Sequence, residues 1–209
     1  MMPSKGYFIT FEGIDGSGKT TQARLLEKKL QTIGYQTHLT REPGGSPGSE
    51  WIRKLLLKQK ALEWSDLTEI LLFFAARKDH VEKTIQPALD TGKIVICDRF
   101  TDSTRIYQGS ENPHHRKIID SLQKHIIQLE PDLTYILSIS AEEALQRTIS
   151  REEDWRLNRL SKSKVNTLIQ DFKNLSIEFP ERCYLFSGSN SPVEIAKEIL
   201  EFTMARFNA

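Results

Sequence analysis

The sequence of 209 residues has little of several features that define particular classes of protein. It has only two cysteines, Cys97 and Cys183, and both lie in apolar, strand-like segments, so we expect buried, reduced thiols and no disulfide. It has no uninterrupted run of about 18 apolar residues, which excludes an ordinary membrane-spanning helix. Residues 1–5 carry no apolar segment followed by a cleavage site, so we expect a soluble, cytoplasmic protein.

The sequence also lacks an excess of charge of either sign. Lys and Arg total 29, and Asp and Glu total 28. A nearly neutral chain has no general electrostatic attraction to DNA, RNA or an anionic membrane, so we expect neither a nucleic-acid nor a membrane partner. Each basic residue must therefore be interpreted at its own position.

Short apolar segments alternate with longer segments of helical periodicity. Strands are predicted near residues 7–11, 36–40, 94–97, 133–139 and 182–186. Helices are predicted near residues 23–34, 47–58, 67–89, 114–129, 141–150, 165–179 and 193–207. Strands that alternate with helices form a parallel sheet covered on both faces. We therefore predict one α/β domain over residues 1–209, with three layers (α/β/α) and a five-stranded parallel sheet.

A glycine-rich segment after the first predicted strand matches the phosphate-binding P-loop, G-x-x-x-x-G-K-[ST]. It consists of Gly13, Ile14, Asp15, Gly16, Ser17, Gly18, Lys19 and Thr20, with Thr21 next. Glycines let backbone N–H groups approach phosphate oxygens, and the helix that follows adds the positive end of its dipole. We expect Lys19 to neutralise the β and γ phosphates of ATP and Thr20 to bind Mg²⁺. P-loops serve several reactions, so this segment alone does not identify the chemistry.

Polar segments also follow the second and third predicted strands, at the edge of the sheet where ligands of such folds bind. After the second strand, a turn contains Arg41, Glu42 and Pro43, which we assign to the site of a phosphate acceptor. An ordinary surface turn is the alternative. After the third strand, Asp98 can hold Mg²⁺ through water, and Arg99 can bind the acceptor phosphate with two parallel hydrogen bonds.

A possible base-binding pair lies in the predicted helix 67–89. Phe73 and Arg77 are four residues apart and therefore share one face of the helix. An aromatic ring beside a guanidinium can stack on a nucleobase and donate hydrogen bonds to its carbonyl edge. A core Phe or a solvated Arg explains either residue taken alone.

Four segments together resemble thymidylate kinases of bacterial type, a family of P-loop nucleoside monophosphate kinases. They are FEGIDGSGKTT, TREPGG, LFFAAR and DRFTDSTRIYQG, and the similarity runs from about residue 7 to 109 and resumes at 131–134. The resemblance implies ATP-dependent phosphorylation of dTMP to dTDP with Mg²⁺, a step in the synthesis of dTTP. It also implies a homodimer formed through helices that flank the sheet, with the apolar segment 70–74 as a candidate contributor.

The resemblance implies roles for individual residues of the acceptor pocket. Asp15 contacts the acceptor sugar and the bound phosphates. Phe73 and Arg77 stack on and recognise thymine, and Arg99 binds the acceptor phosphate. The pocket is further lined by Ser103, Tyr107 and Gln108.

The chain departs from this family in the predicted mobile lid at about 147–164. Several arginines keep matching positions, but Trp155 and Asn158 replace acidic residues. In addition, Gly16 follows Asp15, where some eukaryotic-type relatives have an Arg. Charge on the transferred phosphoryl group must then be neutralised from the lid.

We predict that two lid arginines, Arg151 and Arg156, act in catalysis together with Lys19 and Arg99. Arg147, about one turn earlier, is predicted to pack near the adenine of ATP. The alternative is that these arginines only solvate a charged loop.

Two other functions stay open at this point. The same fold could serve another nucleotide or a deoxynucleoside, and a deoxynucleoside hydroxyl needs a carboxylate base, for which Glu12 and Asp15 are candidates. A phosphate oxygen is already ionised and needs no base. The second alternative is a nucleotide-binding protein without turnover, which only the altered lid supports.

Overall fold

The computed structural model describes residues 6–57, 64–148 and 160–207. Five strands form one sheet in the order β2-β3-β1-β4-β5, and each neighbouring pair is parallel. The strands are β1 (Tyr7–Glu12), β2 (Thr37–Arg41), β3 (Ile94–Asp98), β4 (Leu133–Ser138) and β5 (Cys183–Ser187). The predicted α/β fold with a five-stranded parallel sheet is confirmed.

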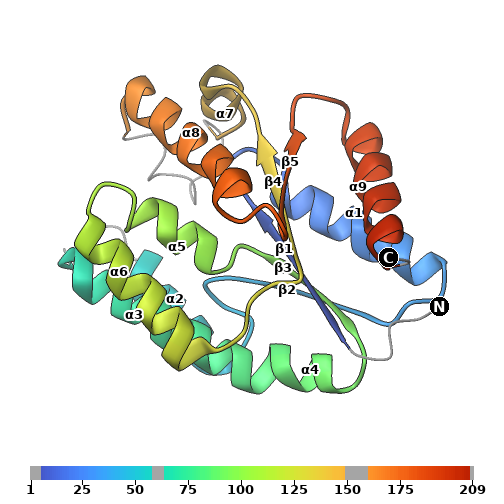
Figure 1. Ribbon diagram of the computed structural model, residues 1–209, viewed down its shortest axis with the longest axis horizontal. Coiled ribbons are helices and arrows are strands. Elements are labelled where there is room, and N and C mark those ends of the chain that lie inside the picture. Colours follow the sequence, from blue (N-terminus) through green and yellow to red (C-terminus); the bar gives the residue numbers. More distant parts are fainter. Residues whose placement is uncertain (1–5, 58–63, 149–159, 208–209) are drawn as a thin grey trace.

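Helices cover both faces of the sheet (Figure 1). α1 (Lys19–Thr32) and α9 (Pro192–Phe207) pack together on one face, where Ile9 and Phe11 of β1 join their apolar cluster. Phe8 of β1 joins the cluster on the opposite face instead. The helices beyond the α1 and α9 pair are α2 (Pro47–Leu57), α3 (Asp66–His80), α4 (Gln86–Asp90), α5 (Thr101–Tyr107), α6 (Pro113–Leu122), α7 (Ala141–Thr148) and α8 (Lys162–Glu178).

Two of the predicted helices are interrupted by a π-helical turn. α3 continues through the π turn Val81–Ile85 into α4, and α6 continues into the π turn Gln123–Ile127. A π turn closes each hydrogen bond over one more residue than an α-helix does, which shifts the face that follows. Apolar periodicity predicts the extent of these segments but not the shift within them.

The helix α5 and the start of α8 were not predicted. The seven residues of α5 begin two positions after Arg99, with Phe100 between them. α8 begins at Lys162, capped by the side chain of Ser161, which accepts a hydrogen bond from the Lys164 amide. Of the predicted lid, residues 147–148 end α7 and residues 162–164 begin α8, while 149–159 lie outside the described residues.

In the described ranges, no helix is both long enough and apolar enough to cross a membrane. Both cysteines are free and buried, as expected.

Candidate active site

The P-loop joins the end of β1 to the start of α1. At Gly13, with φ of 135°, a Cβ atom would lie 2.5 Å from the Leu137 carbonyl oxygen and 2.9 Å from Ser17 Oγ. The loop can therefore pass this close to β4 only with glycine there. Gly18, with φ of 98°, is the residue that precedes α1. This geometry leaves the backbone N–H groups at the start of α1 available to an anion.

Lys19 is the first residue of α1 and is buried, with Nζ donating to the Ile14 carbonyl oxygen at 2.7 Å. Burial lowers the pKa of Lys19 to about 8, and the positive charge of Arg99 acts in the same direction. A phosphate beside the ammonium would favour its charged form. The position and charge of Lys19 fit its predicted role.

Thr20 and Asp98 lie together, although 78 residues separate them in sequence. β1 pairs with β3 so that Phe11 is beside Asp98, and the Thr20 hydroxyl donates to the Asp98 carboxylate. Both offer oxygen ligands, which Mg²⁺ prefers, and Mg²⁺ usually keeps several waters. No cluster of three or more metal-ligating side chains occurs within the described residues. The two oxygens therefore suit an ion that is held mainly by water and phosphate.

Arg99 lies at the centre of a polar cluster between the P-loop and α5. Its side chain is 16% exposed and forms an ion pair with Asp15. Its Nη1 donates to the Gly13 carbonyl oxygen at 3.1 Å and to Ser103 Oγ at 2.8 Å. The guanidinium carbon lies 5.3 Å from the ring centre of Tyr107. Arg99 thus contacts four of the other predicted site residues: Gly13, Asp15, Ser103 and Tyr107.

A second cluster surrounds Arg77 on α3. The Arg77 side chain is 2% exposed; its Nε donates to Glu42 Oε2 at 2.7 Å, and its Nη2 donates to Thr104 Oγ1 at 3.0 Å. The other Glu42 oxygen lies 3.1 Å from His80 Nδ1, and His80 Nε2 lies 2.7 Å from Thr40 Oγ1. The two oxygens of the Glu42 carboxylate thus contact Arg77 and His80, and the carboxylate orients Arg77.

Buried polar atoms with no hydrogen-bond partner in the described ranges mark the same region. Three of the five belong to predicted site residues: Ser17 Oγ, Arg77 Nη1 and Tyr107 Oη. A buried donor without a partner costs free energy, so a polar ligand that satisfies these atoms is favoured. Phe73, which is half-buried, lies one turn before Arg77 on α3. These groups fit a ligand with phosphate oxygens and a carbonyl-bearing base.

Three other predicted acceptor-site residues bind protein groups outside these two clusters. Arg41 is exposed and forms an ion pair with Glu50 of α2 at 3.1 Å. The Pro43 carbonyl oxygen accepts a hydrogen bond from Arg53 at 2.8 Å. Gln108 Nε2 lies 3.5 Å from a Glu69 oxygen.

Of the three predicted lid arginines, only Arg147 belongs to the described residues. Its Nη1 donates to the carbonyl oxygens of Gly16 and Gly188, at 3.3 Å each. Arg147 therefore links the P-loop to the loop that follows β5. Arg151 and Arg156 lie outside the described residues.

The sequence predictions missed residues that hold the site together. Thr104 and His80 both belong to the Arg77 cluster. Thr104 belongs to the segment DRFTDSTRIYQG, in which other residues had been assigned to the site. His80 lies three residues after Arg77 on the same helical face. Glu12 was considered only as a base, but it accepts hydrogen bonds from the start of α5.

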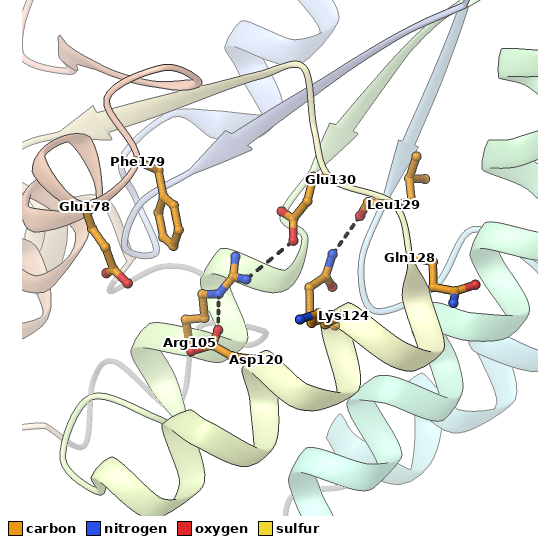
Figure 2. Close-up of a pocket in the computed structure, with 9 residues that line it drawn as sticks. Arg105, Asp120, Lys124, Gln128, Leu129, Glu130, Glu178 and Phe179 are labelled. Atoms are coloured by element: carbon orange, nitrogen blue, oxygen red, sulfur yellow. Dashed lines mark hydrogen bonds and ion pairs between the residues drawn. The ribbon is translucent and has the colours of Figure 1, made fainter.

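A pocket of about 680 Å³ lies behind α5 and contains none of the predicted site residues (Figure 2). Arg105 contacts two of the acidic side chains that line it: Arg105 Nε donates to Asp120 at 2.8 Å, and Arg105 Nη2 lies 3.6 Å from Glu130. Because the Arg105 guanidinium already pairs with carboxylates of the protein, we assign no ligand to this pocket.

The sequence is similar to a family of known proteins. The family model described as thymidylate kinase matches residues 11–199. The thymidylate kinase of Ruegeria pomeroyi is 44% identical over 208 residues, which is 99% of each protein. That of Dinoroseobacter shibae is 45% identical over 201 residues, 95% of this chain and 97% of that protein.

The fold is also similar to that of a solved structure. The crystal structure of thymidylate kinase from Ehrlichia chaffeensis matches with a TM-score of 0.76 and 35% identity, over 96% of this chain and 99% of that one. The chain belongs to the thymidylate kinase family.

Proposed function

We propose that the enzyme transfers the terminal phosphoryl group of ATP to dTMP, giving ADP and dTDP. The observation that carries this proposal is the cluster in which Arg99 joins Asp15 of the P-loop to Ser103 of α5. In this cluster, the Arg99 guanidinium, which we propose binds the acceptor phosphate, contacts the P-loop, which we propose binds the phosphates of ATP. Family membership identifies the acceptor as dTMP.

The attacking atom is a phosphate oxygen that is already ionised, so the reaction needs no general base. Catalysis then depends on positioning and on neutralising negative charge. The oxygens of Glu12 already accept hydrogen bonds from Phe100 N, Ser103 N and Ser103 Oγ. This disfavours Glu12 as the base that a deoxynucleoside acceptor would require.

The acceptor is held at its two ends in this proposal. Arg99 binds the phosphate, and Asp15 lies near the sugar. At the other end, Phe73 stacks on thymine and Arg77 donates to a base carbonyl through Nη1, its buried atom without a partner among the described residues. Because Glu42 and Thr104 hold the other Arg77 nitrogens, only this edge is left for the base.

Mg²⁺ is the expected metal and would be held by Thr20 and by Asp98 through water. When bound, it neutralises charge on the phosphates of ATP. Arg151 and Arg156 are proposed to approach the transferred phosphoryl group from the lid, because Gly16 leaves the P-loop without an arginine there.

We also propose that the enzyme is a cytoplasmic homodimer with neither a nucleic-acid nor a membrane partner. Support for the dimer comes from α2 and α3, which pack against each other and expose Trp51, Leu55, Leu67 and Leu71. Exposed fractions of 70% for Trp51 and 57% for Leu71 are large for apolar side chains. Family membership favours a second copy of the chain as the partner that covers this apolar surface.

The function is tested by initial rates of the purified protein with Mg²⁺, ATP and dTMP, dUMP, dCMP or dGMP. We expect dTMP to have the highest kcat/KM. Faster turnover of dCMP or dGMP would contradict the assignment of the acceptor, and ATP binding without turnover of any nucleotide would contradict the assignment as a kinase.

A further inference from the structure

We propose that Glu12 is a positioning residue for the acceptor phosphate and that it fixes the guanidinium of Arg99 through the hydroxyl of Ser103. The inference rests on the proposed role of Arg99. It assigns to Glu12 a part in acceptor binding that does not require Glu12 to touch either substrate.

Glu12 is the last residue of β1 and has no exposed surface. Its Oε1 accepts from Phe100 N at 2.7 Å and from Ser103 N at 3.2 Å, and its Oε2 accepts from Ser103 Oγ at 2.5 Å. Both oxygens are therefore bound to the segment that carries Arg99 and begins α5. Three hydrogen bonds from Phe100 and Ser103 thus fix the orientation of the Glu12 carboxyl.

The two hydrogen bonds that link Arg99 to Glu12 have a fixed order of donor and acceptor. Ser103 Oγ donates its single proton to Glu12 and accepts a hydrogen bond from Arg99 Nη1 at 2.8 Å. A hydroxyl has one donor and two acceptor positions, so it can do both only while Glu12 acts as the acceptor. The position of Nη1 thus depends on an acceptor 91 residues away from Ser103 in sequence.

The main chain at Arg99 also needs such an anchor. Its φ of 72° lies in the left-handed region, which is costly for a residue with a side chain. The Arg99 amide donates to Phe11 at 2.9 Å, and the next amide, that of Phe100, donates to Glu12. Glu12 therefore holds the backbone that follows Arg99 directly and the far end of the Arg99 side chain through Ser103.

The electrostatics of Glu12 agree with a functional role. Burial, reinforced by the charge of Asp102, raises the pKa of Glu12 to about 7, while Arg99 and the hydrogen bonds oppose the shift. A carboxyl that is costly to ionise is a poor stabilising element. Such groups concentrate at functional sites.

The test is the variant Glu12→Gln. It is assayed first with saturating ATP and varied dTMP, and then with saturating dTMP and varied ATP. In this variant the amide oxygen can accept hydrogen bonds in place of one carboxylate oxygen. The amide nitrogen, which replaces the other oxygen, is itself a donor and faces donors of the Phe100 and Ser103 segment. Because the substitution disturbs the hydrogen bonds that fix Arg99, we expect the KM for dTMP to rise about tenfold and the KM for ATP to change less than about twofold.

A double-mutant cycle with Ser103→Ala isolates the link. If Glu12 acts through this hydroxyl, the double variant is no worse toward dTMP than the worse single variant, within about twofold. Ser103→Ala alone also tests the link if Glu12→Gln does not fold, since it should raise the KM for dTMP selectively. Additive effects, or an unchanged KM for dTMP in the folded single variants, overturn the proposal.

The matched control is Thr101→Val, which removes another buried hydrogen bond of α5, from Thr101 to Gln123 at 2.6 Å, without touching Arg99. It should lower the melting temperature but leave the KM for dTMP unchanged. An equal rise in this KM would assign the effect to a loosened α5 and overturn the proposal.

Arg99→Lys separates this inference from the function on which it rests. It keeps the charge but loses the planar fork, so the KM for dTMP should rise well above any change in the KM for ATP. An unchanged KM for dTMP would mean that Arg99 has been given the wrong role. A raised KM in Arg99→Lys together with a normal one in Glu12→Gln would reject the link alone.

Discussion

The two cations nearest to the phosphate site differ in how firmly the protein already holds them. Lys19 Nζ donates to one carbonyl oxygen, while Arg99 binds Asp15, Gly13 and Ser103 together. A guanidinium fixed by several partners is positioned before its ligand arrives. An ammonium with a single neutral partner can turn to a phosphate at little cost. Arg99 is thus suited to the acceptor, and Lys19 is suited to the group that moves.

We therefore expect Lys19→Ala to fold normally and to lower turnover by about a thousandfold, because removing one preorganised charge donor has costs of this order. Initial rates and a thermal melt of the same preparation check this. Near-normal turnover in the folded variant would contradict the role of Lys19.

At the scale of single elements, α5 depends on a buried ion network more than on its own length. Asp102 binds Arg182 Nη1 at 2.6 Å and Nη2 at 3.0 Å, and Arg105 Nη1 at 2.8 Å. Arg105 reaches on to Asp120 in the pocket behind the helix (Figure 2). A helix of seven residues is too short to be stable alone, so these contacts keep Ser103 and Tyr107 in place.

Asp102→Ala should lower the free energy of unfolding by about 3–5 kcal/mol, because it leaves buried arginine charges without a partner. Denaturant unfolding at pH 7 measures the loss. The KM for dTMP of the folded fraction provides an independent check that α5 is still in place.

The same variant gives a test by pH. Although burial acts to raise it, hydrogen bonds and charge from Arg182, then from Arg105, lower the pKa of Asp102 from 3.8 to about 2. A lowered carboxyl pKa contributes stability above the unfolded value and loses it as the pH falls through the folded value. The stability difference between wild type and Asp102→Ala should therefore shrink from about pH 4 to about pH 2, and a constant difference would contradict this.

The predicted lid, which includes residues outside the described ranges, carries the next prediction. Arg151→Ala or Arg156→Ala should lower kcat at least about a hundredfold with much smaller changes in nucleotide affinity, as expected for contacts made mainly in the transition state. Steady-state rates and nucleotide binding, measured on each variant, test this. Trp155→Phe is the control and should keep most activity. If both arginine variants turn over normally, Lys19, Mg²⁺ and Arg99 must suffice.

At the scale of the whole molecule, the strand order brings the site together. β1 and β3 are neighbours at the centre of the sheet, so the P-loop and the Asp98-Arg99 pair emerge side by side. β2 lies on the other side of β3, and the Glu42 amide donates to the Asp98 carbonyl oxygen at 3.0 Å. Three loops thus meet at one edge of the sheet, as is usual for ligand sites in parallel α/β folds.

The proposed dimer is tested with Leu71→Glu, which places a charge in the apolar surface of α2 and α3. We expect the wild type to have twice the chain mass of 24.0 kDa in light scattering and the variant to have the mass of one chain. Ile177→Glu is the matched control, since Ile177 is 79% exposed on α8. A monomeric wild type, or equal dissociation by the control, would contradict this interface.

Much of the fold was predictable, and the phosphate site could be proposed, because their signals are local. The P-loop is one continuous segment whose glycines and Lys19 suffice to identify a phosphate site. The five strands stand out as short apolar segments between helices. Each of these features depends on neighbours in sequence, where periodicity and turn chemistry act directly.

The partners of the site residues could not be predicted, since they are distant in sequence. Arg77 and Glu42 lie 35 residues apart, and Ser103 and Glu12 lie 91 apart. No periodicity links such residues, and a buried carboxylate looks the same in sequence whether it binds a ligand or an arginine. Glu42 was accordingly assigned to the acceptor, whereas its contacts are with Arg77 and His80.

The sequence by itself determined that this chain binds nucleotide phosphates in a parallel α/β domain, because that chemistry is encoded within short segments. Only the tertiary structure decided which charges are already paired and which buried polar atoms have no hydrogen-bond partner within the described ranges. The physical reason is that the pairing follows from strand order and helix packing, which bring together groups that the chain itself keeps apart. Lys19 could be proposed as a phosphate ligand from its neighbours in sequence, but the contacts of Glu12 with Phe100 and Ser103 could not be predicted.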